Sequence, residues 1–197
     1  MTALKPIESA EAVRPLGWAP SGSPQVLVAV LADDPEIVAA GLVHSRPAVP
    51  HADWVGVSLP SHVPAGRLAR VLSQEPALRE RASARLVLLG HGYAGGIALG
   101  LVLGGALTCS GIVGLDIPAA PHEVVQTNAK IRLVQRAGDR GEDGLGLADV
   151  FRRRGIDLRC MVLPGADHGA ANADVAAFWA VRTFLVELVA TACALPT

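Results

Sequence analysis

One stretch of the sequence decides the fold: residues 85–99, which read RLVLLGHGYAGGIAL. Residues 85–89 form the short apolar run of a buried strand, and the residues after 94 are apolar enough for a buried helix. The glycines at positions 90, 92, 95 and 96 allow a sharp turn between them without side-chain collisions. The stretch therefore predicts a strand, a tight turn and a helix, with position 92 projecting from the tip of the turn.

The same alternation of short apolar runs and helix-like segments continues along the whole chain, which is typical of βαβ units on a parallel sheet. We expect strands over residues 26–31, 54–59, 85–89, 111–115, 130–135 and 158–163. We expect helices over residues 35–43, 65–83, 94–107, 121–127, 145–154 and 172–192, the first of them capped by Asp34 with Pro35 at its first position. The pattern predicts an α/β fold with about six parallel strands and helices on both faces.

Composition indicates one globular domain. The 197 residues suit a single core, and 51% hydrophobic against 18% charged residues excludes a disordered chain. A formal net charge of -1 leaves no basic excess for nucleic acid. We expect an N-terminal arm over residues 1–24, without the apolar run of a signal peptide, and a domain over residues 25–197.

Cysteine usage and hydropathy favour a cytoplasmic protein that makes no membrane contact. The three cysteines have neither disulfide-framework nor zinc-site spacing, so we expect no metal and no cofactor. The uncharged stretch 86–115 is broken by glycine and polar residues, and the run 175–195 is interrupted by Arg182 and Glu187. We interpret these as a buried core and an amphipathic surface helix.

The turn at residues 90–96, GHGYAGG, resembles the G-H-S-Y-G-G nucleophile elbow of the α/β-hydrolase superfamily, particularly its small esterases, thioesterases and dienelactone-hydrolase-like members. The resemblance covers roughly residues 25–192 and implies a minimal domain without a lid, since only about 14 residues separate the fourth and fifth predicted strands. In this alignment Gly92 stands where the family has its serine. A shift by one residue would place Tyr93 there, at the cost of the Gly-His opening.

The resemblance also implies the remaining catalytic groups, which follow the nucleophile in the order acid, histidine. Residues 164–169, PGADHG, resemble the P-G-A-G-H loop, so His168 is the expected histidine. The loop after the strand at 130–135 has Gly141 at the position of the acid, which leaves Asp139 or Asp143 as its carboxylate.

An oxyanion-binding site is the weakest part of the resemblance. Relatives have a His-Gly pair after the first core strand, whereas this chain has Ala32, Asp33, Asp34 and Pro35. A carboxylate there would oppose an oxyanion by roughly 3–4 kcal/mol if it faced the site. The candidates are Ala32, the backbone N–H of Tyr93, and His91, which either packs beside the turn or contributes to binding.

Three functions follow from these residues. The first is a protein of ester or thioester hydrolase ancestry that acts on a small acyl compound, with at most weak hydrolysis or proton transfer by His168. The second is a catalytically inactive pseudoenzyme that binds a ligand or protein partner. The third is an ordinary serine esterase that has been inactivated by an engineered glycine in place of the natural serine at position 92. Substrate identity and oligomeric state do not follow from the sequence.

Overall fold

The computed structural model describes residues 12–13, 26–59, 85–117, 127–136, 151–164 and 170–194, with side chains described outside 12–13 and 170–173. Its strands are β1 (Ala12–Val13), β2 (Leu27–Ala32), β3 (Asp53–Ser58), β4 (Leu86–His91), β5 (Gly111–Leu115), β6 (Lys130–Arg136) and β7 (Leu158–Leu163). Its helices are α1 (Pro35–Ser45), the short 3-10 helix η1 (Arg46–Ala48), α4 (Gly92–Leu103) and α6 (Ala170–Cys193). The six predicted strands are confirmed, with ends that move by at most one residue except at β4, which ends two residues later than predicted.

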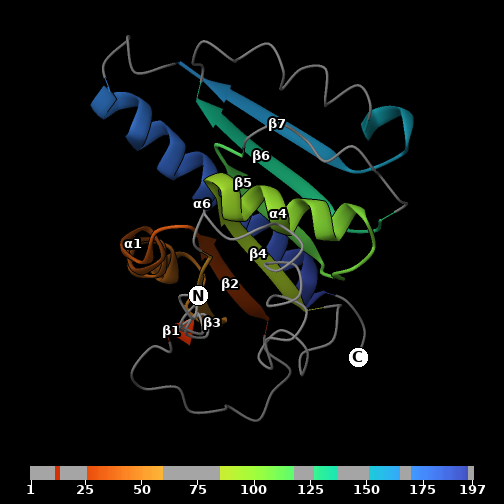
Figure 1. Cartoon of the computed structure of the whole chain (residues 1–197), viewed down its shortest axis with the longest axis horizontal. Helices are drawn as coiled ribbons and strands as arrows, with labels where there is room; N and C mark the ends of the chain where they lie inside the picture. Colours follow the sequence, from red (N-terminus) through yellow and green to blue (C-terminus); the bar gives the residue numbers. More distant parts are fainter. Residues whose placement is uncertain are drawn as a thin grey trace, which may run out of the picture.

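The strands form one sheet in the order β1-β3-β2-β4-β5-β6-β7 (Figure 1). The pairs from β3 to β7 are all parallel, as expected, while β1 pairs antiparallel with β3 and adds an edge strand that the sequence pattern did not predict. The other residues of the expected N-terminal arm lie outside the described residues, as do the predicted helix at 65–83, most of that at 121–127 and the first part of that at 145–154.

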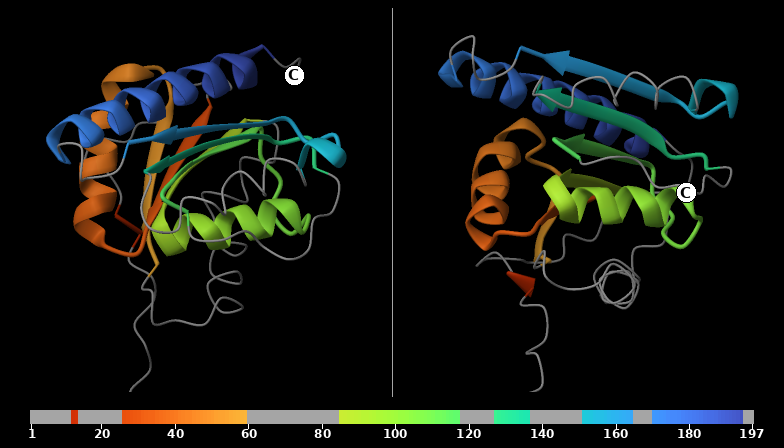
Figure 2. Two further views of the ribbon diagram at one scale, coloured as in Figure 1. Left: turned by 90° about the horizontal axis from the view of Figure 1, so that it is seen from above. Right: turned by 45° about the horizontal axis from the view of Figure 1, so that its top comes forward.

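Helices cover both faces of the sheet, with α4 on one face and α1 and α6 on the other (Figure 2). Residues of β2 alternate between the two cores: Leu27, Ala29 and Leu31 pack on the α4 side, and Val28 and Val30 pack on the α1 and α6 side. Both faces of a parallel sheet are buried in this way, which explains why its strands are continuous apolar runs.

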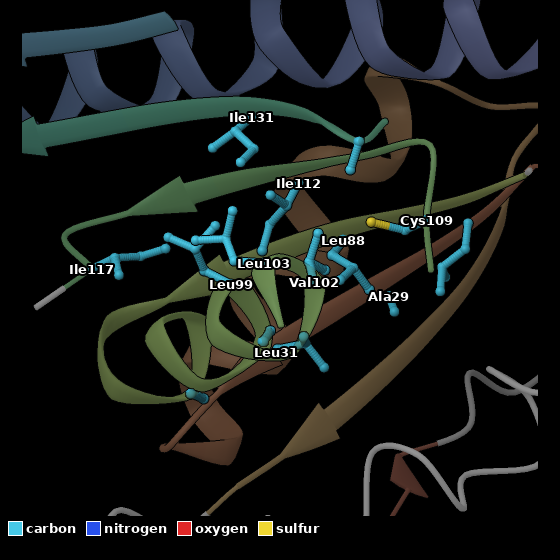
Figure 3. Packing of buried hydrophobic residues seen from close by; sticks show 14 of the residues in the cluster. Ala29, Leu31, Leu88, Leu99, Val102, Leu103, Cys109, Ile112, Ile117 and Ile131 are labelled. Atoms are coloured by element: carbon cyan, nitrogen blue, oxygen red, sulfur yellow. The ribbon is translucent and has the colours of Figure 1, made fainter. Parts of the chain in front are cut away.

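The core on the α4 side explains why α4 is apolar on all sides. Leu99, Val102 and Leu103 are fully buried against Leu88 and Ile112 of the sheet (Figure 3). The helix begins two residues before the predicted start and ends at Leu103, with Gly104 as its C-cap. It ends earlier than predicted because Gly105 takes a φ of 73° that a continuing helix cannot adopt.

The uncharged stretch 86–115 is β4, α4 and β5, so it is no single membrane span. Helix α6 is long and apolar enough to cross a membrane by length and composition, but 44% of its most apolar window is buried. Its buried side, which includes Leu185 and Leu188, packs on the sheet.

Candidate functional site

The strand order points to one place on the sheet where a ligand can bind. From β2 the chain runs through α1 to β3 on one side, and from β4 it runs through α4 to β5 on the other side. The connections therefore diverge between the neighbouring strands β2 and β4, and in open α/β sheets ligands bind beyond the carboxyl ends of strands at such a point. Asp33 and Gly92 are the residues that follow these two strands.

The turn between β4 and α4 is as tight as the sequence predicts. A Cβ atom on Gly90 would lie 2.6 Å from the Cα of Gly95, and one on Gly95 would lie 2.7 Å from the carbonyl carbon of Gly90. The backbones of β4 and α4 thus touch directly, which only glycine at both positions allows.

Gly92 is the first residue of α4 and has a φ of 53°, in the left-handed region that favours glycine. Tyr93, the residue that a one-position shift would place at the tip, is a residue of α4 whose ring packs against the core on the α4 side. The strained backbone position of this turn is therefore Gly92, which has no side-chain atom.

Asp33 faces this turn. In the parallel register of β2 and β4, Leu31 lies opposite Gly90, which brings residue 33 opposite residue 92. A Cβ atom on Gly92 would lie 4.0 Å from the Oδ1 of Asp33, and no other atom of a described residue comes within 4 Å, apart from residues 91 and 93 and the backbone of α4. The sequence pattern suggested a carboxylate near this position without showing which way it points.

The neighbouring carboxylate of Asp34 has a structural role. It is exposed and accepts a hydrogen bond of 2.8 Å from the backbone N–H of Glu36, which caps α1 as predicted. The two adjacent aspartates thus differ in function, because one caps a helix and the other turns toward Gly92.

Ala32 and His91, the other two predicted binding residues, make no hydrogen bond to the turn at Gly92 among the described residues. Ala32 has a fully buried side chain, and its carbonyl accepts from the N–H of Leu59. His91 precedes α4 without capping it, and its buried Nδ1 has no hydrogen-bond partner among the described residues. By the alternation along β4, the side chain of His91 follows Leu89 to the α1 and α6 face of the sheet.

A third aspartate at this edge escaped the sequence analysis. Asp116 follows β5 with a φ of 49°, and it accepts hydrogen bonds from the backbone N–H and the Nε of Arg136 at 2.9 and 2.6 Å. Hydrogen bonding to Asp116 raises the pKa of Arg136, which also pairs with Asp174 of α6. Its position one residue beyond a predicted strand was the signal that could have found it.

The predicted residues His168, Asp139 and Asp143 lie outside the described residues. They follow β7 and β6, which end at Leu163 and Arg136. Because these strands run parallel to β4, both end at the same edge of the sheet as Gly92.

Cys109, which follows α4, is too deeply buried to act as a nucleophile. Burial raises the pKa of the Cys109 thiol to about 12, so it stays protonated and is no nucleophile. Within the described ranges no group of three or more His, Cys, Asp or Glu side chains could hold a metal ion.

Comparison with known proteins places the fold. No family model matches the sequence, and no curated protein sequence matches it either. Solved structures do match: esterase PE8 is 17% identical, with a TM-score of 0.61 over 91% of this chain and 98% of that one. A carboxylesterase from Mesorhizobium loti is 16% identical, with a TM-score of 0.55 over 80% of this chain and 88% of that one. A carboxylesterase from Bacillus cereus is 13% identical, with a TM-score of 0.57 over 79% and 87%.

The chain thus has the α/β-hydrolase fold in single-domain form, as its elbow resemblance implied. At these identities the likeness concerns the fold alone.

Proposed function

We propose that this chain descends from carboxylic ester or thioester hydrolases and acts on a small acyl compound without forming an acyl-enzyme. The observation that carries the proposal is Gly92, which starts α4 with a φ of 53° at the strand-to-helix turn. Acyl transfer through the enzyme needs an attacking side-chain atom at this position. Glycine supplies none, so hydrolysis here has to use water directly.

In this proposal His168 takes a proton from the attacking water, and Asp139 or Asp143 orients its imidazole. The backbone N–H of Tyr93, in the first turn of α4, faces the carbonyl oxygen. Turnover is slow, because enzymes that lose their triad retain a rate only about 10³–10⁴-fold above that in water. The cysteines are free, which suits the cytoplasmic location that we propose with it.

One observation favours the alternative of a binding protein without turnover. The carboxylate of Asp33 faces Gly92, and its charge favours a neutral or positively charged ligand beside it. Binding of such a ligand needs no attacking atom at position 92.

Labelling with a fluorophosphonate, followed by intact-mass measurement, tests for the missing nucleophile. We expect no adduct on the wild-type chain and one adduct on Gly92→Ser if the rest of the site is organised. Gly105→Ser is the matched control, because Gly105 also has a positive φ, of 73°, and has open space around its Cβ position among the described residues. An adduct on the wild-type chain contradicts the proposal.

Hydrolysis of short p-nitrophenyl esters separates the enzyme from the binding protein. The proposal expects turnover above the buffer rate that is lost in His168→Ala. Absence of turnover in the wild-type chain supports the binding protein instead.

A further inference from the structure

Asp33 is the described carboxylate at the carboxyl edge of the sheet whose role folding does not explain. Asp34 caps α1, and Asp116 is held by the backbone and guanidinium of Arg136. The carboxylate oxygens of Asp33 make no hydrogen bond or ion pair with any described residue, although its backbone carbonyl accepts from Ser58 at 3.4 Å. A partly buried charge costs stability unless something else solvates it.

The Oδ1 of Asp33 lies close to the position where a side chain on residue 92 would begin. It is 4.0 Å from the point where Gly92 would carry its Cβ, and apart from residues 91 and 93 and the backbone of α4 no other atom of a described residue comes as near. Water donates to a carboxylate oxygen across roughly 2.6–3.0 Å. A water bonded to Oδ1 on the side of Gly92 fits the length of this gap, as the hydroxyl of a serine at position 92 would.

From this juxtaposition we infer that Asp33 holds the attacking water in place of the missing serine hydroxyl. The inference rests on the proposed function, and it adds a catalytic residue to it. Gly92 leaves the space, and Asp33 accepts one hydrogen of the water, so the oxygen lone pair is directed away from the carboxylate toward the acyl carbon.

The chemical step is balanced without any co-reactant. The water oxygen bonds to the acyl carbon as the carbonyl electron pair moves to its oxygen, and His168 takes the water proton that Asp33 does not hold. The carbonyl then re-forms as the bond to the alkoxide or thiolate breaks, and the leaving group takes the proton from His168. The products are the carboxylic acid and the alcohol or thiol.

The inference assigns specificity as well. A substrate that places a second carboxylate beside the acyl carbon meets the charge of Asp33, whereas a neutral acyl group does not. The site is expected to prefer small uncharged acyl groups over those of dicarboxylic acids.

Steady-state hydrolysis of p-nitrophenyl acetate by three variants tests the inference. Misplacing the reacting water is expected to lower kcat of Asp33→Ala on the order of 10²-fold, with a much smaller change in KM. Asp33→Asn keeps an acceptor oxygen and the shape of the side chain, so it is expected to retain part of the lost rate. It also keeps the test valid if the alanine variant does not fold.

Asp34→Asn is the matched control. It removes the same charge one residue away, and asparagine caps helices as well as aspartate does, so kcat is expected to stay at the wild-type value. If Asp33 acted only through its net charge or through folding, the Asp33 and Asp34 variants would lose kcat to the same extent.

The outcomes separate this inference from the proposed function. Wild-type kcat in both Asp33 variants, together with loss of activity in His168→Ala, overturns the role of Asp33 and leaves direct hydrolysis intact. Equal losses in the Asp33 and Asp34 variants overturn it too. A fluorophosphonate adduct on the wild-type chain overturns the proposed function itself, and so does turnover that His168→Ala leaves unchanged.

Discussion

Two charged regions of this molecule are built in opposite ways. Arg132 of β6 has a fully buried side chain, yet its guanidinium donates to Asp157 at 2.9 Å and to Glu187 of α6 at 2.7 Å. At the carboxyl edge, Asp33 faces the open position beside Gly92 and has no side-chain partner among the described residues. The charge of Arg132 is satisfied by hydrogen bonds, whereas the carboxylate of Asp33 has no such bonds to described residues.

The difference separates charges that hold the fold from charges that are free to bind. Burial lowers the pKa of Arg132, but hydrogen bonds and charge interactions with Glu187 and Asp157 outweigh it and raise that pKa overall. These interactions offset the cost of burying the guanidinium, and the arginine links β6 to α6. A carboxylate without such partners among the described residues, at a topological switch point, is available to a ligand or a reacting water.

The largest expected effect is on the glycine contact that shapes the turn. Gly90→Ala places a Cβ 2.6 Å from the Cα of Gly95, where only backbone could move, so we expect the free energy of unfolding to fall by about 3 kcal/mol or more. Urea denaturation followed by circular dichroism measures this loss.

Gly41→Ala provides the control for Gly90→Ala. Its Cβ would approach a side-chain atom, the Cγ1 of Val30, to 2.9 Å, and alanine stabilises the interior of α1 by about 1 kcal/mol relative to glycine. The net change is expected to be small. Equal losses in the two variants would show that the contact of β4 with α4 is not special.

The next effect concerns the ion pairs of Arg132. Glu187→Ala removes one partner of Arg132 and is expected to destabilise the chain by about 2 kcal/mol, since Asp157 remains and Glu187 is partly hydrated. Arg159→Ala is the control, because its pair with Glu187 spans 3.4 Å at an exposed surface and is worth about 1 kcal/mol at most. A larger loss in Arg159→Ala would contradict this assignment.

Acid is expected to weaken the same region. The hydrogen bonds from Arg132 hold the pKa values of Asp157 and Glu187 below their usual range. Their contribution is therefore complete above the unfolded pKa values, near pH 4–4.5, and is lost as the pH falls through the lower folded values. The stability difference between wild type and Glu187→Gln, measured between pH 7 and pH 3, should shrink on acidification. A constant difference would contradict the pairing.

The smallest effect concerns Gly92 itself. Gly92→Ala has room for its Cβ among the described residues, so only the φ of 53° opposes it, at a cost of about 1 kcal/mol. Gly105→Ala, with a φ of 73° and no described atom within 4 Å of its Cβ position apart from its chain neighbours, is expected to cost the same. A much larger loss in Gly92→Ala would mean that the space beside Asp33 is filled.

Sequence patterns predicted the strands well because each is a short, largely apolar run, and β2, β4 and β5 are buried on both faces of the sheet. They also predicted the turn at Gly92, because the tight contact of Gly90 with Gly95 needs glycine at two fixed positions. Sequence patterns could not predict the orientation of Asp33, because it depends on the pairing of β2 with β4, two strands separated by more than fifty residues. The strand at Ala12–Val13 was missed because two residues carry no periodicity.

A crystal structure of the chain at high resolution, without a bound ligand, tests most directly whether the position beside Gly92 is built to hold the attacking water. We predict an ordered water roughly 2.6–3.0 Å from the Oδ1 of Asp33, at the position that a serine hydroxyl on residue 92 would take. A protein side chain in that position, or an Asp33 carboxylate turned away from Gly92 into solvent, would contradict the account.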